Sequence, residues 1–133
     1  MKFILILIIT WLLNGSIKFI INLYTSKNNA LTLIGYGGFP STHSAIISSF
    51  YFYAGFNYGF NNIIMIPLLV TFWIVINDAL NLRKYIGLHA KSLNKLDPSS
   101  SHRERIGHKY HEVLGGILVG LISSIALTYL LKI

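Results

Sequence analysis

The sequence contains no cysteine and only four acidic residues, and both features restrict the class of protein. Without cysteine there can be no disulfide, no thiolate nucleophile and no zinc–thiolate site. Charged residues make up 11% of the 133 residues, whereas a soluble domain usually has about 25%. Hydrophobic residues account for 53%, and the mean hydropathy is +0.60. This composition indicates an integral membrane protein, and the length predicts one membrane domain over residues 1–133.

The shortage of acidic residues leaves a strongly basic chain. Eleven lysines and arginines stand against the four acids, which gives a net charge of +7. In a soluble protein this excess would suggest nucleic acid as a partner. In a membrane chain it indicates topology-setting loops, contact with anionic headgroups, or a phosphate-bearing lipid substrate. We therefore expect membrane lipids and a lipid phosphate as partners, and no nucleic acid.

Four apolar stretches are long enough to cross, or nearly cross, a bilayer. They cover residues 3–24, 40–56, 63–82 and 113–131. Each must be helical, because unpaired backbone groups in hydrocarbon cost several kcal/mol apiece. The first stretch also resembles a signal peptide, but no small-residue cleavage site follows it. The predicted fold is thus an all-α membrane bundle of about four transmembrane helices.

One long polar loop, residues 83–111, separates the last two apolar stretches. Its first half has helical spacing, with apolar residues from Ile86 to Leu96 on one side and lysines on another. This pattern predicts an amphipathic helix lying along the membrane interface. Asp97-Pro98 and the serines that follow predict its end and a flexible link.

Four spans place both termini on one side of the membrane and the two polar loops on the other. Basic residues follow the same division. The loop side holds Lys27, Arg83, Lys84, Lys91, Lys95, Arg103, Arg105 and Lys109, and the terminal side holds Lys2 and Lys132. The positive-inside tendency therefore predicts that the loops face the cytoplasm across the inner (plasma) membrane. Basic residues retained for a substrate would give the same distribution.

The predicted topology gathers separate polar groups at this loop-side face. They are Lys18; Ser41, Thr42 and His43; Asp78, Arg83 and Lys84; and Arg103, Arg105, His108, His111 and Glu112. Ionisable groups in or beside spans are costly, so a cluster of them indicates a functional site. Each has a simpler explanation when taken alone. Lys18 could extend to the interface, His43 could be a satisfied interhelical histidine, and Asp78 with Arg83 could form a structural ion pair.

The segment from Gly37 to Ser44, Gly-Gly-Phe-Pro-Ser-Thr-His-Ser, has the features of a phosphate site. Gly37 and Gly38 allow the backbone to approach a ligand, and Pro40 suits a first helical turn. The free N–H groups of a helix start attract anions, and the hydroxyls of Ser41 and Thr42 add donors. His43 can exchange a proton near neutral pH. A capped helix start alone would not explain the histidine.

A second segment, residues 103–112, contains a histidine and a carboxylate four residues apart. On a helix His108 and Glu112 would share a face, where Glu112 can hold the imidazole in one tautomer and raise its basicity. Such an imidazole can act as a nucleophile or a base. Arg103 and Arg105 can bind phosphate oxygens and stabilise the charge that builds up during phosphoryl transfer.

These motifs together resemble the divergent branch of the phosphatidic acid phosphatase type 2 superfamily, also described as acid phosphatase and vanadium-dependent haloperoxidase-related. The resemblance rests on residues 37–44, Asp78-Ala79 with Arg83-Lys84 and Gly87, Asn94-Lys95-Leu96, and Gly107-His108 with Glu112-Val113. It covers residues 14–128. The superfamily motif Pro-Ser-Gly-His corresponds to residues 40–43 with Thr42 for glycine, and the end of the last superfamily motif corresponds to His108 and Glu112 with glutamate for aspartate. The first superfamily motif, a lysine followed by Arg-Pro, has no counterpart.

The resemblance implies a metal-independent lipid phosphatase that needs no cofactor. It implies His108 as the nucleophile that forms a phosphohistidine, Glu112 as its orienting partner, and His43 as the acid that protonates the leaving group. His111 is an alternative nucleophile, because it lies six residues after Arg105 as the superfamily spacing requires. The alternative function is a protein that binds, transports or assembles lipid phosphates without hydrolysing them. Four short helices enclose little volume, so a homodimer is also plausible.

Overall fold

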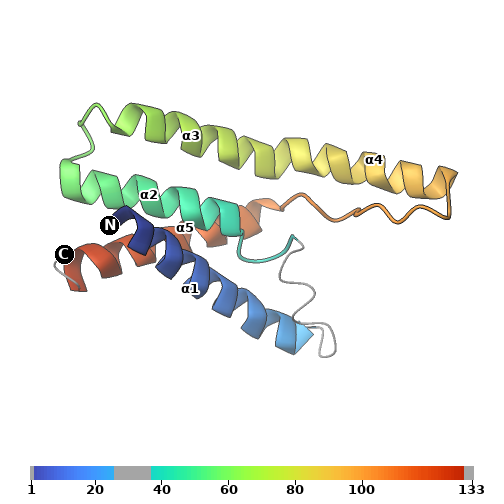
Figure 1. Cartoon of the computed structure of the whole chain (residues 1–133), viewed down its shortest axis with the longest axis horizontal. Helices are drawn as coiled ribbons and strands as arrows, with labels where there is room; N and C mark the ends of the chain where they lie inside the picture. Colours follow the sequence, from blue (N-terminus) through green and yellow to red (C-terminus); the bar gives the residue numbers. More distant parts are fainter. Residues whose placement is uncertain (1, 26–36, 131–133) are drawn as a thin grey trace.

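The computed structural model describes residues 2–25 and 37–130, which form helices joined by loops (Figure 1). The helical segments are α1 (Lys2–Thr25), α2 (Thr42–Tyr58), α3 (Met65–Asn77), the π-helical turn η2 (Asp78–Leu82), α4 (Arg83–Leu96), α5 (Tyr110–Ile125) and the π-helical turn η3 (Ala126–Leu130). There is no β-strand in these two ranges. The predicted all-α class is confirmed.

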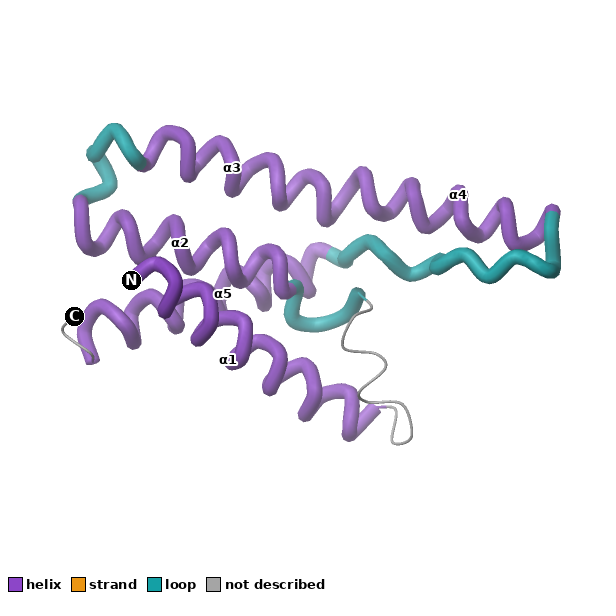
Figure 2. The backbone as a smooth tube through the Cα atoms, in the orientation of Figure 1, coloured by secondary structure: helices purple, strands orange, loops and turns teal. Residues whose placement is uncertain are grey.

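Helices α2 and α5 form the centre of the bundle and run side by side in the same direction (Figure 2). α1 runs the opposite way and packs on both of them, whereas α3 packs along α2. The starts of α2 and α5 therefore lie together at one end of the bundle, next to the end of α3. This end brings together the polar segments that the sequence predicts to be functional.

Small residues allow α2 and α5 to approach each other closely. A Cβ atom added at Gly116 would collide with the carbonyl oxygen of Ser41, and one added at Gly120 would collide with the hydroxyl of Ser48. The hydroxyl of Ser124 donates to the Ser49 carbonyl oxygen across the same contact, at 2.9 Å. Such small-residue contacts are typical of helix packing in membranes, where dispersion and hydrogen bonds replace the hydrophobic effect. We call this contact the glycine–serine seam.

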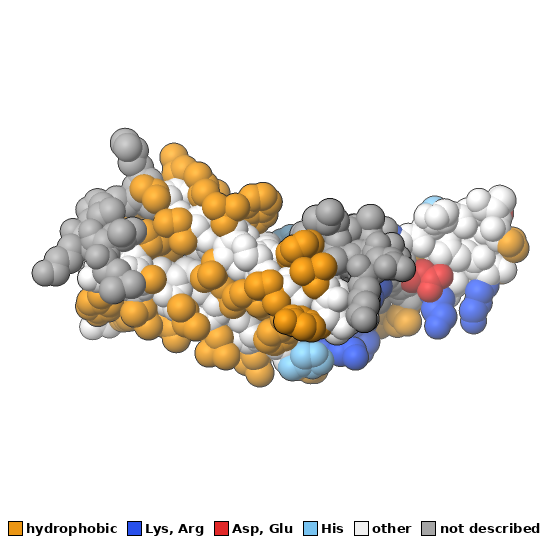
Figure 3. Space-filling model, turned by 90° about the horizontal axis from the view of Figure 1, so that it is seen from below, with side chains coloured by type: hydrophobic (Ala, Val, Ile, Leu, Met, Phe, Trp, Pro, Cys, Tyr) orange, Lys and Arg blue, Asp and Glu red, His pale blue; other side chains and the backbone are white. Residues whose placement is uncertain are grey.

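The chain is a membrane protein. Three of the described helices are long and apolar enough to cross a bilayer: Phe3–Thr25, Met65–Leu96 and Tyr110–Tyr129. Large hydrophobic side chains cover their outer surfaces, and basic side chains gather toward one end of the molecule (Figure 3). The remaining predicted span, 40–56, forms the 17-residue α2. It begins at Thr42 and not at Pro40, because Ser41 is its N-cap residue.

The segment 83–96 is helical, as the sequence predicts, but it is not a separate helix in the loop. α4 continues α3 in the same direction through η2, so that Met65–Leu96 is one helical segment of 32 residues (Figure 1). The predicted boundary rested on the change from apolar to charged residues at Arg83. A change of polarity does not end a helix; the first helix-breaking signal is Asp97-Pro98, and the helix ends there.

The segment between α4 and α5 returns along α4 in an extended course, held by Asn94. The Asn94 side-chain amide donates to the carbonyl oxygen of His102 at 2.8 Å and to the Glu104 carboxylate at 2.9 Å, and its oxygen accepts from the His102 N–H at 2.9 Å. Gly87 lets the backbone at Glu104 lie directly on α4. The His108 N–H then donates to the Ala79 carbonyl oxygen in η2, at 3.0 Å. These contacts fix where His108 enters the bundle.

Candidate functional site

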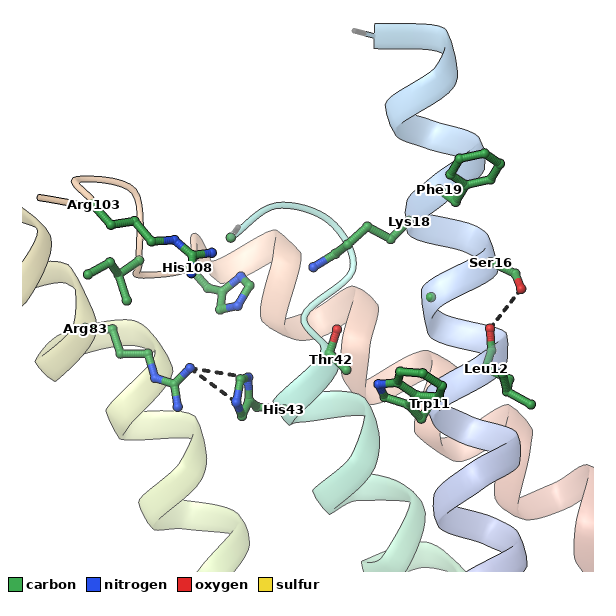
Figure 4. Close-up of a pocket in the computed structure, with 13 residues that line it drawn as sticks. Trp11, Leu12, Ser16, Lys18, Phe19, Thr42, His43, Arg83, Arg103 and His108 are labelled. Carbon is green, nitrogen blue, oxygen red and sulfur yellow. Dashed lines mark hydrogen bonds between the residues drawn. The ribbon is translucent and has the colours of Figure 1, made fainter. Parts of the chain in front are cut away.

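A pocket of about 770 Å³ lies where α2 begins (Figure 4). Its walls come from α1, the turn before α2, the start of α2, the start of α4 and the returning segment. The residues that line it are Trp11, Leu12, Gly15, Ser16, Lys18, Phe19, Gly37, Thr42, His43, Arg83, Arg103, Ile106 and His108. Both predicted active-site histidines therefore face the same pocket as one lysine and two arginines.

His108 is buried and paired with the carboxylate of Glu112. Its Nδ1 lies 3.0 Å from Glu112 Oε2, which also accepts the Lys109 N–H at 3.0 Å. His108 precedes α5, so the carboxylate reaches back from the first turn of the helix. Burial lowers the pKa of His108 below its ordinary value, although Glu112 opposes this shift. The imidazole is thus neutral at pH 7, with its proton on Nδ1 facing Glu112 and the lone pair on Nε2.

His43 lies in the first turn of α2, next to a guanidinium group. Arg83 Nη1 lies 3.3 Å from Nδ1 and 3.4 Å from Nε2 of this ring. The Nε of Arg83 pairs with Asp78, five residues earlier, because the π-helical turn brings these two positions together. Asp78 thus orients the guanidinium, which in turn contacts His43.

Lys18 is a buried cation at the wall of this pocket. Only 4% of its surface is exposed, and its side chain extends from α1 toward the histidines (Figure 4). None of the carboxylates that the structure describes forms an ion pair with it. A buried charge without a counter-ion is costly, which favours an anionic ligand at this position.

The other predicted residues lie around the pocket. Thr42 and Arg103 line it, and Gly37 places its backbone against Gly107. Gly38 has a φ of +109°, which glycine adopts most readily. Pro40 and Ser41 are buried beneath the pocket, and the Ser41 N–H donates to the Glu112 carbonyl oxygen at 2.8 Å. This last bond links the two histidine-bearing segments.

Three of the predicted residues outside the pocket wall are exposed, namely Lys84, Arg105 and His111. Arg105 Nη2 is 3.6 Å from Glu112 Oε1, with 68% of its side chain exposed. Lys84 and His111 line a neighbouring depression, where the His111 ring lies 6.5 Å from that of Phe39. The structure therefore brings His108, and not His111, to the wall shared with Lys18 and His43. Lys27, one of the predicted loop-side basic residues, lies outside the described residues.

The family model described as the Divergent PAP2 family matches residues 1–123. The chain belongs to this family. Neither the curated proteins nor the solved structures gave a match. The resemblance inferred from the sequence motifs is confirmed, and the chain is a phosphatase-related membrane protein.

Sequence reasoning missed one polar residue beside this pocket. The Asn14 amide donates to the Thr42 hydroxyl at 2.9 Å and to the Pro40 carbonyl oxygen at 3.4 Å, which joins α1 to the start of α2. Its position within an apolar span, four residues before Lys18, was the available signal, because buried polar groups in spans need partners. The apolar wall formed by Trp11, Gly15 and Phe19 carried no comparable signal.

Proposed function

We propose that the chain is a membrane-embedded, metal-independent phosphatase that hydrolyses a lipid or polyprenyl phosphate monoester through a phosphohistidine intermediate. The observation that carries this proposal is the buried Lys18, which lines the same pocket as His108 and His43 and has no described counter-ion. A phosphate group supplies the missing negative charge. Membership of the Divergent PAP2 family supports phosphatase chemistry.

In the first half of the reaction, His108 attacks phosphorus. Lys18, Arg83 and Arg103 bind the phosphate oxygens and stabilise the charge of the transition state. The bond between His108 Nε2 and phosphorus forms while the bond from phosphorus to the lipid oxygen breaks. Glu112 stabilises the positive charge that develops on the imidazole, since it accepts the Nδ1 proton. His43 donates a proton to the leaving alkoxide.

In the second half, water hydrolyses the phosphohistidine. His43, now deprotonated, accepts a proton from the water as its oxygen attacks phosphorus. The phosphorus–nitrogen bond breaks, inorganic phosphate is released, and both histidines return to their starting states. Every proton is thus transferred by a side chain at the pocket wall, and no redox step is needed.

The proposal includes an orientation in the membrane. The pocket lies at the end of the bundle that holds Arg83, Arg103 and most other basic residues, which favours a cytoplasmic position in the inner (plasma) membrane. A reporter inserted near Ser100 is then accessible only from the cytoplasm, and tags on the termini only from outside. A homodimer remains part of the proposal, to be measured as the mass of the purified protein.

The experiment compares two neighbouring histidines. Purified protein in nanodiscs is supplied with a panel of lipid and polyprenyl phosphates, and phosphate release is measured together with acid-labile phosphoenzyme. His108→Ala should abolish both. His111→Ala is the matched control and should retain both, because His111 is exposed and lies outside the pocket wall.

The outcome distinguishes the two candidate functions. If the wild-type chain binds lipid phosphates but releases no phosphate from any of them, it is a binding or assembly protein. If His111→Ala abolishes the phosphoenzyme and His108→Ala does not, the nucleophile is His111.

A further inference from the structure

The wall that α1 contributes to the pocket changes from charged to apolar along the helix. Trp11, Gly15 and Lys18 are spaced by four and three residues, so they share one face of α1. Lys18 lies at the end near His108, and Trp11 lies two helical turns away, about 10 Å along the axis (Figure 4). The pocket therefore has a phosphate-binding end and an apolar end.

Gly15 leaves open space between these two ends. A Cβ atom added there would have no neighbour within 4 Å, whereas one added at Gly116 or Gly120 would collide with α2. Gly15 is thus not a packing glycine like those of the seam. Its missing side chain keeps the pocket continuous from Lys18 to Trp11, a residue that is 58% exposed.

We infer that this face of α1 is a subsite for the hydrocarbon chain next to the phosphate, with Gly15 as its floor and Trp11 as its far wall. The inference rests on the proposed function for the identity of the head group. It assigns the substrate class as a phosphate ester of a long linear chain, either alkyl or isoprenoid. The chain enters from the bilayer along α1 and its phosphate reaches Lys18.

The subsite positions the substrate more than it attracts it. A lipid tail in the bilayer is already out of water, so moving it into an apolar groove gains little hydrophobic energy. A tail fixed along α1 does, however, restrict where the phosphorus atom lies relative to His108, and such positioning lowers the barrier. Blocking the groove should therefore reduce kcat/KM for long-chain substrates in particular.

The test compares dodecyl phosphate with butyl phosphate, which have the same primary alkoxide leaving group and differ in chain length. The measured quantity is the ratio of their kcat/KM values in nanodiscs. Gly15→Leu fills the groove and should lower this ratio by roughly 10-fold or more, the effect expected when a side chain occupies ligand space. Trp11→Ala removes the far wall without adding bulk and should also lower it. Leu13→Phe adds bulk to an exposed position outside the pocket and should leave it unchanged.

The result that overturns the inference is a ratio within about twofold of wild type in both Gly15→Leu and Trp11→Ala. Farnesyl phosphate, assayed in parallel, shows whether isoprenoid and alkyl chains are accepted equally. If the wild-type chain hydrolyses none of these esters, the proposed reaction fails, but the subsite is still tested by binding. Dodecyl phosphate should then bind the wild-type protein more tightly than the Gly15→Leu protein. Inorganic phosphate, which has no hydrocarbon chain, should bind both proteins equally. Equal binding of dodecyl phosphate to both proteins refutes the subsite.

Discussion

Replacing Glu112 by glutamine tests the central claim about His108. The substitution keeps the shape of the side chain and leaves a carbonyl oxygen that can accept from His108 Nδ1 and from the Lys109 N–H. It removes the negative charge 3.0 Å from the imidazole. Since attack on phosphorus makes the imidazole positive, loss of the carboxylate charge should destabilise the transition state more than the resting protein.

The size of the effect follows from the geometry. At an effective dielectric constant of about 20, unit charges at this separation attract by on the order of 5 kcal/mol. A glutamine oxygen retains part of this as a neutral hydrogen bond, so the net loss is about 3 kcal/mol, or roughly 10²-fold in kcat. The acid limb of the kcat/KM profile should also move to lower pH, because Glu112 is the group that raises the pKa of His108 against burial.

The assay is phosphate release from a lipid phosphate in nanodiscs between pH 5 and pH 8. Glu104→Gln is the matched control, because Glu104 is exposed and its carboxylate accepts from Asn94 at 2.9 Å, a bond that glutamine can also make. It should keep both kcat and the pH profile. A Glu112→Gln protein with more than about a third of wild-type kcat and an unmoved acid limb would refute the role of this pair.

Three further outcomes follow from the structure. Gly120→Val should destabilise the protein by roughly 1–3 kcal/mol, because the added side chain forces apart the glycine–serine seam. The loss should be seen as a lower midpoint of thermal unfolding in detergent. Leu118→Val, at an exposed position, should leave the midpoint unchanged. Burial lowers the pKa of His108 in the folded chain below its ordinary 6.5. The unfolded state therefore binds more protons in mildly acidic solution, and the free energy of unfolding falls as the pH drops below 6.5. His108→Gln should flatten this pH dependence, and an unchanged slope would contradict the burial of a neutral imidazole. Asn94→Ala removes four hydrogen bonds to the returning segment and should speed amide exchange at residues 102–107 more than in α5. Equal exchange in both proteins would show that Asn94 does not hold this segment.

The parts of the site that the sequence predicts are those set by local spacing. Four residues separate His108 from Glu112, so the chain keeps the two side chains within reach of each other. The expectation that they share a helix face was wrong, because His108 precedes α5 and Glu112 reaches back to it from the first turn. The apolar spans could likewise be predicted from the sequence, because the bilayer requires a certain length and an apolar composition of each helix separately. The grouping of the two histidine segments at one end follows from counting spans.

The parts that the sequence could not predict depend on how helices meet. The continuation of α3 into α4 depends on backbone hydrogen bonding through η2, where the change in polarity gave a false boundary at Arg83. Whether Lys18 reaches the interface or is buried depends on the rotation of α1 against α2. The bond from Asn14 to Thr42 fixes that rotation, and neither residue reveals the other in the sequence.

The glycine–serine seam has a consequence for the chemistry of the pocket. His43 stands in the first turn of α2 and His108 shortly before α5, so the spacing of the two imidazole rings depends on the distance between the two helix axes. That distance is set by contact of backbone with backbone and not by the fit of large side chains. Residues on the lipid-facing surface can therefore change to suit bilayers of different composition without altering the reaction geometry. A single added methyl group within the seam, at Gly116 or Gly120, would alter it.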